Sequence, residues 1–268
     1  MYFYNVLFLF TTIVVNAALG QSVSEWGARS AAMGNSNVTS SDVYSGLNNI
    51  AGLSLQNNLA FYFGFKNNFG VAAFSGAYAG LNLPIKSKTA SISFSRFGDN
   101  LYNEQTLSLG VAHQLNYISL GVKVDLLQQH IDETLTRRCV AIALGGMVEI
   151  TKYLTFGGYV WNINQAKKQH SEHYLPTLLK AGFAYNKDNK FIISNEVYKS
   201  TEHKPDLRFG LEYFLTEWFA FRTGLNTYPL KLCMGAGFRK KVFGLDYAYN
   251  NHHLLDNIHQ ISLVYSIK

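Results

Sequence analysis

The feature that most constrains the fold is an alternation of apolar and polar residues that recurs along most of the chain. In the stretch SLGVKVDLLQQH, residues 119–130, apolar side chains alternate with small residues and with Lys123 and Asp125. Successive side chains of a β-strand point to opposite faces, so this stretch would have one apolar and one polar face. A soluble protein buries such apolar faces, but this chain offers few candidate helices to cover so many of them.

From Asn58 onward the sequence contains about fourteen such segments, each near the 9–11 residues that a tilted strand needs to cross a bilayer. We predict strands at 58–66, 69–78, 87–96, 105–114, 118–129, 137–149, 153–163, 177–186, 191–199, 205–215, 218–226, 231–239, 241–249 and 257–267. An even number suits a bacterial single-chain barrel. Segment 153–163 is ambiguous, because aromatic residues fall on both of its faces.

The connections between these segments support a barrel. In an even-stranded barrel both termini lie on the periplasmic side, and the even-numbered connections should be short. They are short at 115–117, 151–152, 186–190, 216–217 and 240, whereas the odd connections 130–136, 164–176 and 250–256 are longer. The second connection, 79–86, is an exception. A soluble β-sandwich is not expected to alternate short and long connections in this way. We therefore predict an all-β, antiparallel, up-and-down transmembrane barrel of about 14 strands.

Composition agrees with this interpretation. Charged residues make up 15% of the chain, aromatic residues also 15%, and there are 22 glycines. This balance is typical of membrane barrels, where half of each strand faces lipid. The net charge is +6, but Lys and Arg are scattered singly, which argues against nucleic acid. The expected contacts are outer-membrane lipid and lipopolysaccharide.

Residues 1–20 are apolar and uncharged, with an apolar core at 6–15 and small residues at 17–20. This pattern predicts a signal peptide cleaved near Gln21, although no Lys or Arg follows Met1. A short buried strand or helix is the alternative. We therefore divide the chain into a signal peptide at 1–20, an N-terminal segment at 21–57 and a barrel at 58–268.

Two regions at opposite ends of the chain resemble one known family. The N-terminal region carries Gly27-Ala28-Arg29, then Met33-Gly34, then Asn49-Ile50-Ala51-Gly52-Leu53. The C-terminal region carries GLDYAY at 244–249 and HQISL at 259–263. Both resemble the FadL-like outer-membrane proteins, especially the PorV/PorQ branch of Bacteroidetes-type bacteria. Ile50 stands where that family usually has proline.

The resemblance implies a fourteen-stranded barrel with its N-terminal segment folded into the lumen as a plug, in the outer membrane of a Gram-negative, Bacteroidetes-type cell. It also implies one of two functions. PorV and PorQ are accessory components of type IX secretion, with secretion-machinery proteins as partners. FadL itself passes hydrophobic small molecules across the outer membrane.

The first candidate site is the plug. The segment is rich in Asn, Ser and Asp, which suits turns and a polar lumen. An exposed periplasmic tail is the alternative. The candidate plug or gate residues are Gly27, Arg29, Met33, Gly34, Asn49, Ala51 and Gly52.

The second candidate site is the charged lumen wall. Strand parity directs eight charged residues inward, namely Lys123, Asp125, Lys180, Glu196, Arg208, Glu212, Arg222 and Asp246. They can pair with one another and with the plug, because an unpaired charge in a narrow interior is costly, or they can form a selectivity lining. Four positive and four negative charges disfavour a charge-selective porin.

Other side chains give weaker signals. The histidines of HSEH (170–173) and His252–His253 lie in loops without the scaffold of a metal site. His259 and Ser262 fall on opposite faces, which excludes a Ser–His pair. The cysteines, Cys139 and Cys233, lie on distant strands, so we predict two free thiols. We expect no enzyme activity, cofactor or metal.

Aromatic residues near strand ends suggest girdles at the two membrane interfaces, with ordinary core aromatics as the alternative. These residues are Tyr62, Tyr78, Tyr117, Tyr153, Trp161, Trp218, Tyr228 and Tyr249.

Three functions remain open at this point. The first is a PorV/PorQ-like accessory role in type IX secretion, and the second is a FadL-like conduit for small hydrophobic molecules. The inward face predicted from the sequence is mainly small and polar, which favours the first. The third, a soluble β-rich binding protein, is disfavoured by the sorted turns.

Overall fold

The computed structural model of the protein describes residues 25–132, 135–169, 174–188, 190–251 and 256–267. The predicted signal peptide and the histidines at 170, 173, 252 and 253 lie outside these ranges. Among the described residues, no helix is long and apolar enough to cross a membrane.

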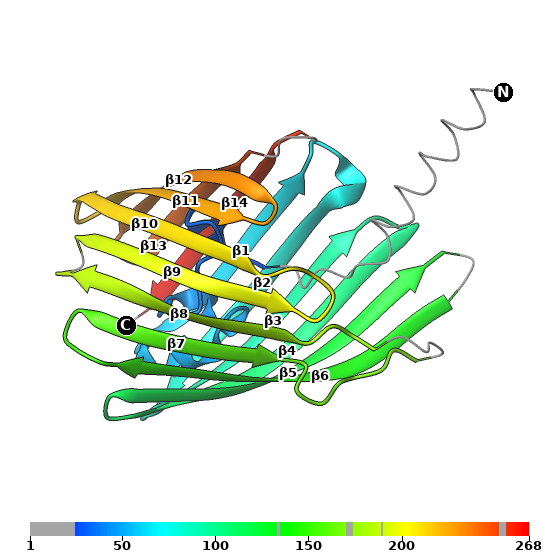
Figure 1. Ribbon diagram of the computed structural model, residues 1–268, viewed down its shortest axis with the longest axis horizontal. Helices are drawn as coiled ribbons and strands as arrows, with labels where there is room; N and C mark the ends of the chain where they lie inside the picture. The colour runs from blue at the N-terminus through cyan, green and yellow to red at the C-terminus, as the bar shows by residue number, and fades with distance from the viewer. Residues whose placement is uncertain (1–24, 133–134, 170–173, 189, 252–255, 268) are drawn as a thin grey trace.

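Fourteen antiparallel strands close into a barrel in which each strand pairs with its sequence neighbours and β14 pairs with β1 (Figure 1). The strands are β1 (Leu59–Asn68), β2 (Ser75–Ile85), β3 (Lys88–Gly98), β4 (Tyr102–Leu115), β5 (Ile118–Ile131), β6 (Leu135–Glu149), β7 (Leu154–Trp161), β8 (Leu178–Lys187), β9 (Phe191–Ser200), β10 (Asp206–Thr216), β11 (Phe219–Thr227), β12 (Leu230–Lys240), β13 (Phe243–Asn250) and β14 (Ile258–Ile267). The predicted all-β barrel of about 14 strands is therefore confirmed.

The prediction of the second strand was wrong. It was placed at 69–78, but β2 runs from Ser75 to Ile85, and residues 69–74 form a loop with the short helix η3 (Ala72–Phe74). Phe69 and Gly70 have φ of 63° and 68°, and the Gly70 N–H donates to the Asn67 side chain, so the extended chain ends there. Pro84 lies inside β2, one residue before its end.

This correction removes the exception in the turn pattern. The second connection is now the short turn at 86–87, and all six even-numbered connections are short: 86–87, 116–117, 150–153, 188–190, 217–218 and 241–242. We call this end of the barrel the turn end and the opposite end the loop end. β4, β5 and β6 are the longest strands and extend the wall at the loop end (Figure 1).

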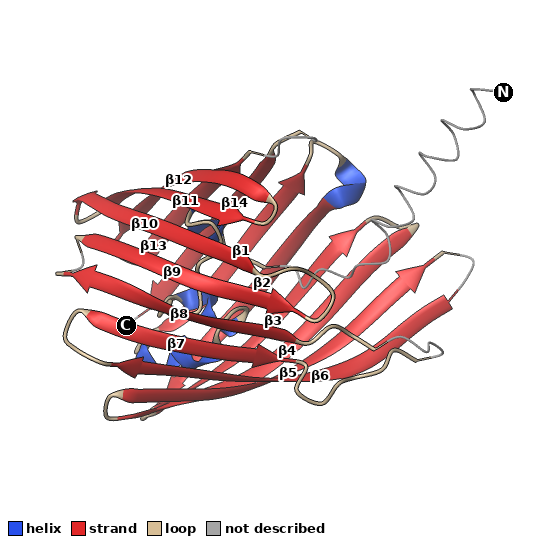
Figure 2. Cartoon of the chain, in the orientation of Figure 1, coloured by secondary structure: helices blue, strands red, loops and turns tan. Residues whose placement is uncertain are grey.

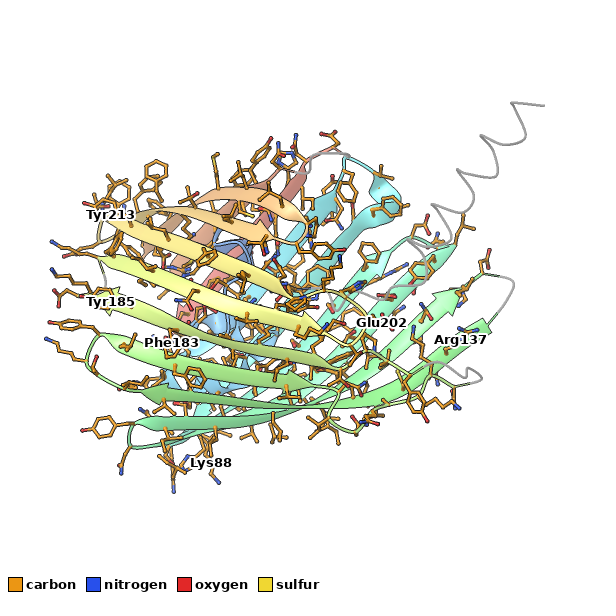
Figure 3. All side chains as sticks on the ribbon, in the orientation of Figure 1. Lys88, Arg137, Phe183, Tyr185, Glu202 and Tyr213 are labelled. Carbon is orange, nitrogen blue, oxygen red and sulfur yellow. The ribbon has the colours of Figure 1, made fainter. Side chains whose placement is uncertain are left out.

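The outer face of the wall is apolar. On β1, Phe61, Phe63 and Phe65 are each more than 40% exposed, and on β3 the same holds for Ile92 and Phe94. In Figure 3, Phe183, Tyr185 and Tyr213 also point outward. An exposed apolar surface on a closed barrel is the construction of a protein that crosses a membrane with strands. The apolar faces of the repeated segments are therefore directed at lipid.

The N-terminal segment lies inside the barrel. It contains α2 (Ala28–Ala32), η1 (Val43–Gly46) and η2 (Ile50–Leu55), which appear within the ring of strands in Figure 2. α2 contacts β11 to β14, and η2 contacts β3 to β6 on the other side of the lumen. The two 3-10 helices are capped locally, because the side chains of Asp42 and Asn49 accept the N–H groups of Tyr44 and Ala51. We refer to residues 25–56 as the plug.

Candidate functional site: the plugged lumen

The predicted plug residues lie in the lumen. Gly27, Met33, Gly34, Asn49, Ala51 and Gly52 are buried, and the side chain of Arg29 is 12% exposed. Gly34 has φ of 64°. A Cβ added to Gly224 of β11 would lie 2.1 Å from the backbone nitrogen of Gly34. Glycine on both sides therefore allows the two backbones to touch.

Glycines also form the seat of η2. A Cβ added to Gly110, Gly121 or Gly145, on the adjacent strands β4, β5 and β6, would lie 2.6–3.2 Å from the Ile50 side chain. Ile50 is fully buried in this recess with Leu53 and Ala112. Ile50, which stands where the resembled family usually has proline, therefore fills this recess.

Arg29 connects the plug to β10. Its guanidinium donates to both carboxylate oxygens of Glu212, with 2.5 Å between Nη2 and Oε2, and to Oδ2 of Asp42 at 2.7 Å. Burial alone would lower the pKa of Arg29, but Glu212 and Asp42 hold that pKa well above its ordinary value. The two carboxylates therefore favour the charged form of Arg29.

The ion pairs continue along the wall from β10 to β13. Arg222 donates to Glu212 at 2.6 Å and to Asp246 at 2.8 Å, and Arg239 donates to Asp246 at 2.9 Å. The hydroxyl of Tyr44 in the plug also donates to Asp246, at 3.2 Å. This network holds α2 and η1 against one side of the barrel.

A second network surrounds Glu25, at the start of the described plug. Its carboxylate accepts from Lys180 and from Arg208, the latter at 2.8 Å. Arg208 also pairs with Glu196 at 3.1 Å and with Asp206 at 2.8 Å. Burial raises the pKa of Glu25, but Arg208 and Lys180 outweigh this effect and lower it to about 2.

The remaining two predicted wall charges lie on β5. Lys123 donates to the carbonyl of Leu47 in the plug at 3.0 Å and lies 3.6 Å from Asp125. The Trp161 indole Nε1–H donates to Asp125 at 2.7 Å.

All eight wall charges are buried, and each takes part in an ion pair. Three of their partners, Glu25, Asp206 and Arg239, were not predicted from the sequence, and neither was Asp42, which pairs with Arg29 of the plug. The parity of β10 and β12 places Asp206 and Arg239 inward, so both could have been found. The partners in the plug could not, because they depend on its path through the lumen.

The inner wall also carries an apolar cluster, which corrects the expectation of a small and polar inward face. It consists of Val38, Leu127, Ala141, Ala143, Tyr159, Trp161, Ala166, Leu175 and Leu178, with Cys139 and Tyr198 packed against it. These residues come from the plug, β5 to β9 and the 162–177 loop. The sequence feature that pointed to this cluster is the presence of aromatics on both faces of segment 153–163, because two of them, Tyr159 and Trp161, face inward.

The predicted aromatic girdles are correct only in part. Tyr117, Trp218 and Tyr228 are about half exposed or more, but Tyr62, Tyr78 and Trp161 are buried in the lumen. Tyr62 and Tyr78 form a second cluster with Trp26 and Tyr44 of the plug, with the Trp26 and Tyr78 rings 5.2 Å apart. Tyr62 alternates with Phe61 and Phe63, so parity would have directed it inward.

A cavity of about 230 Å³ lies between the plug and the turn-end half of β6 to β9. Arg29, Thr39 and Ser40 line it from the plug, and Met147, Thr155, Ala184 and Ser194 are among the wall residues that line it. The hydroxyl of Ser194 is buried and has no hydrogen-bond partner in the described part of the chain.

The remaining side-chain predictions can be placed as follows. Cys139 and Cys233 are free, as predicted. Ser262 is buried and accepts the Ala28 N–H, whereas His259 is outside, where Tyr247 contacts it. Within the described ranges, no group of three or more His, Cys, Asp or Glu side chains could hold a metal.

Comparisons with solved structures show that this fold is known. The toluene transporter TodX of Pseudomonas putida has a TM-score of 0.65 over 91% of this chain and 97% of its own, at 11% identity. The monoaromatic hydrocarbon channel CymD has a TM-score of 0.65 over 90% and 96%, at 12% identity. A FadL homologue of Pseudomonas aeruginosa has a TM-score of 0.66 over 89% and 98%, at 10% identity.

These likenesses show a shared barrel fold. No family model matches the chain, and no curated protein matches it.

Proposed function

We propose that the protein is a conduit for small hydrophobic molecules across the outer membrane. The observation that carries this proposal is the apolar cluster on the inner wall, because apolar surface within a polar lumen favours the binding of hydrophobic molecules. Trp161 and Leu178 in this cluster are each 2% exposed, on a wall whose other inward residues are mainly charged or small. The cluster lies beside the plug and provides an apolar environment within a polar lumen.

The fold comparisons support this proposal. The similar barrels are described as a toluene transporter and a monoaromatic hydrocarbon channel. Transport of such molecules requires an apolar site away from water, since burial of apolar surface drives their binding. The charged networks would then hold the plug rather than select ions, because the eight wall charges are paired.

Binding can be tested with the fluorescence of Trp161. The chain has three tryptophans, so the double variant W26F/W218F leaves Trp161 inside and W26F/W161F leaves Trp218 on the outer face. The probe is p-bromotoluene, whose bromine quenches tryptophan, added to the full chain in detergent. We expect saturable quenching of Trp161 and non-saturating quenching of Trp218, which reports partitioning into detergent. Non-saturating quenching of both would contradict the proposal.

A second candidate is an accessory role in type IX secretion, favoured by the PorV/PorQ-like sequences at 27–53 and 244–263. Affinity purification from native outer membranes separates the two. Secretion subunits in the purified complex support the accessory role, and bound apolar small molecules without them support the conduit.

A further inference from the structure

We propose that the outer face of β3 to β6 at the loop end is a binding surface for lipopolysaccharide, with Arg96 and Arg138 contacting the two phosphates of its lipid A moiety. This inference is independent of what passes through the lumen, because it concerns only the face of the wall that is directed at lipid. It depends on the barrel lying in an outer membrane with its loop end outward, as the short turns at the opposite end indicate.

The surface is a row of four polar side chains on four neighbouring strands. The cross-strand pairs are Arg96 with Gln105, Gln105 with Gln128, and Gln128 with Arg138. All four alternate with inward residues of their strands, and both arginines are exposed. Neighbouring strands lie about 4.8 Å apart, so the two arginines are about 14 Å apart across the sheet. The row therefore presents two separated cations with two amides between them.

This polar row lies at the edge of the apolar belt. The next outward residues toward the turn end pair across the same strands and are apolar, namely Phe94, Leu107, Leu126 and Val140. On β3, Lys88 and Arg96 are eight residues apart, and the outward residues between them are apolar. This separation is about 26 Å along the strand, and a tilt of about 40° reduces it to about 20 Å across the membrane, close to the ~25 Å apolar band of membrane barrels. Arg96 therefore lies where acyl chains meet head groups.

The positive charge is local to this sector of the wall. Beyond β3 the same row continues with apolar residues, namely Ala77 on β2, Phe65 on β1 and Ile261 on β14. Within the described ranges, no acidic side chain lies on the outer face of β3 to β6. Lys167 adds a third exposed cation close to β6, because its segment continues to Gln169, whose N–H donates to the Arg138 carbonyl at 3.2 Å. An anionic head group would therefore be attracted to this sector.

The arginines retain hydrogen-bond donors for a ligand. Arg138 donates from Nε to Oε1 of Gln128 at 2.9 Å, and Arg96 donates from Nη2 to the carbonyl of Asp99 at 3.2 Å. Neither arginine forms an ion pair with another residue in the described part of the chain. A guanidinium has five N–H donors and binds phosphate oxygens through two parallel hydrogen bonds. Each arginine can therefore hold one phosphate.

The ligand that fits is a lipid with two separated phosphates. Its acyl chains would pack on the apolar row from Phe94 to Val140, and each phosphate would accept hydrogen bonds from one guanidinium. Lipid A has a phosphate at each end of a disaccharide and lies in the outer leaflet, which is the leaflet at the loop end. Phosphatidylglycerol has a single phosphate, so it can engage only one of the two arginines.

Native mass spectrometry of the full chain in detergent tests this surface, with purified diphosphoryl lipid A as the probe. The variant is R96Q/R138Q, because glutamine keeps a polar side chain at the membrane boundary while it removes the charge. The matched control is K88Q/K190Q, which removes two exposed lysines at the turn end. Gel mobility without heating verifies that each barrel is folded.

We expect the native chain to bind one lipid A molecule and R96Q/R138Q to bind it at least about ten-fold more weakly, because charge-assisted hydrogen bonds to both phosphates are lost. The control should change the affinity less than about two-fold, since its lysines lie at the other end of the barrel. Monophosphoryl lipid A and phosphatidylglycerol should each bind the native chain at least about ten-fold more weakly than diphosphoryl lipid A.

Equal affinity of R96Q/R138Q and the native chain for lipid A would overturn the proposed surface. Equal affinity of the native chain for phosphatidylglycerol and lipid A would overturn the choice of ligand, because the row would then recognise any lipid phosphate. If the double variant does not fold, R96Q and R138Q are measured singly, and the proposal fails if neither weakens binding. None of these results bears on passage through the lumen.

Discussion

At the scale of single residues, buried ion pairs in the lumen join the plug to the wall, and each charge depends on its partner. Glu212 is fully buried and accepts from Arg29 in the plug and from Arg222 in the wall. Buried ion pairs add little net stability when complete, but removing one partner leaves an uncompensated charge in a place that water reaches poorly. The side chains that hold the plug are therefore also those whose loss should release it.

We predict that Glu212→Gln destabilises the barrel by roughly 3 kcal/mol, because Arg29 and Arg222 lose their shared carboxylate. The matched control, Glu217→Gln, lies in the exposed turn between β10 and β11 and should change stability by less than about 0.5 kcal/mol. Denaturant unfolding in detergent measures both. Equal midpoints for the two variants would show that the network does not hold the plug.

Glu25 leads to a prediction of how the stability of the protein changes at low pH. Its pKa falls from 4.5 to about 2 in the folded protein, because the attraction of Arg208 and Lys180 outweighs burial. A depressed carboxylate pKa contributes stability that is present above 4.5 and is lost as the pH falls toward 2. The difference in unfolding temperature between the native chain and Glu25→Gln should therefore be constant above pH 5 and shrink below it. A difference that stays constant down to pH 2 would refute this assignment.

At the scale of elements, the fit between η2 and the wall depends on glycines that face inward. A Cβ on Gly145 would lie 2.1 Å from Asn49 Oδ1 and 3.1 Å from the Ala51 nitrogen, whereas a Cβ on Gly146, the next residue of β6, would meet only Leu120, at 3.7 Å. The two glycines share a strand and differ in the face they occupy. They therefore separate the effect of the plug from the effect of strand propensity.

We predict that Gly145→Ala destabilises the barrel by about 1–3 kcal/mol through overpacking against η2. Gly146→Ala should be neutral or slightly stabilising, since alanine loses less backbone entropy than glycine in a strand. Unfolding of both variants in the same detergent tests this pair. If Gly145→Ala is as stable as Gly146→Ala, η2 is not seated as described.

Most strands could be predicted from the sequence because alternation, strand length and turn residues are local properties. β2 was misplaced because the predicted strand began at residue 69, directly after the end of the first one, whereas Phe69 and Gly70 have positive φ and the strand begins only at Ser75. The plug could be predicted only as a polar segment. Its contacts join residues far apart, such as Glu25 and Lys180, and helices as short as η1 and η2 have no period to detect. Trp161 was grouped with the girdle aromatics because it lies near the end of a segment whose two faces both carry aromatics and could not be told apart.

At the scale of the whole molecule, two surfaces have opposite characters. The outside is apolar and continuous around a closed sheet, as lipid requires. The inside is mainly polar: ion pairs along β5 and β8–β13 hold the plug, and an apolar cluster lies along β5–β9.

The central claim is that small hydrophobic molecules pass through this barrel. Its most direct test is the initial rate of radiolabelled toluene uptake by Gram-negative cells with and without the protein, alongside cells carrying Leu178→Glu, which places a charge in the apolar cluster. The account predicts faster uptake with the native chain and a return toward background with the folded Leu178→Glu variant. Equal uptake in all three kinds of cell, with the barrel folded in the outer membrane, would contradict it.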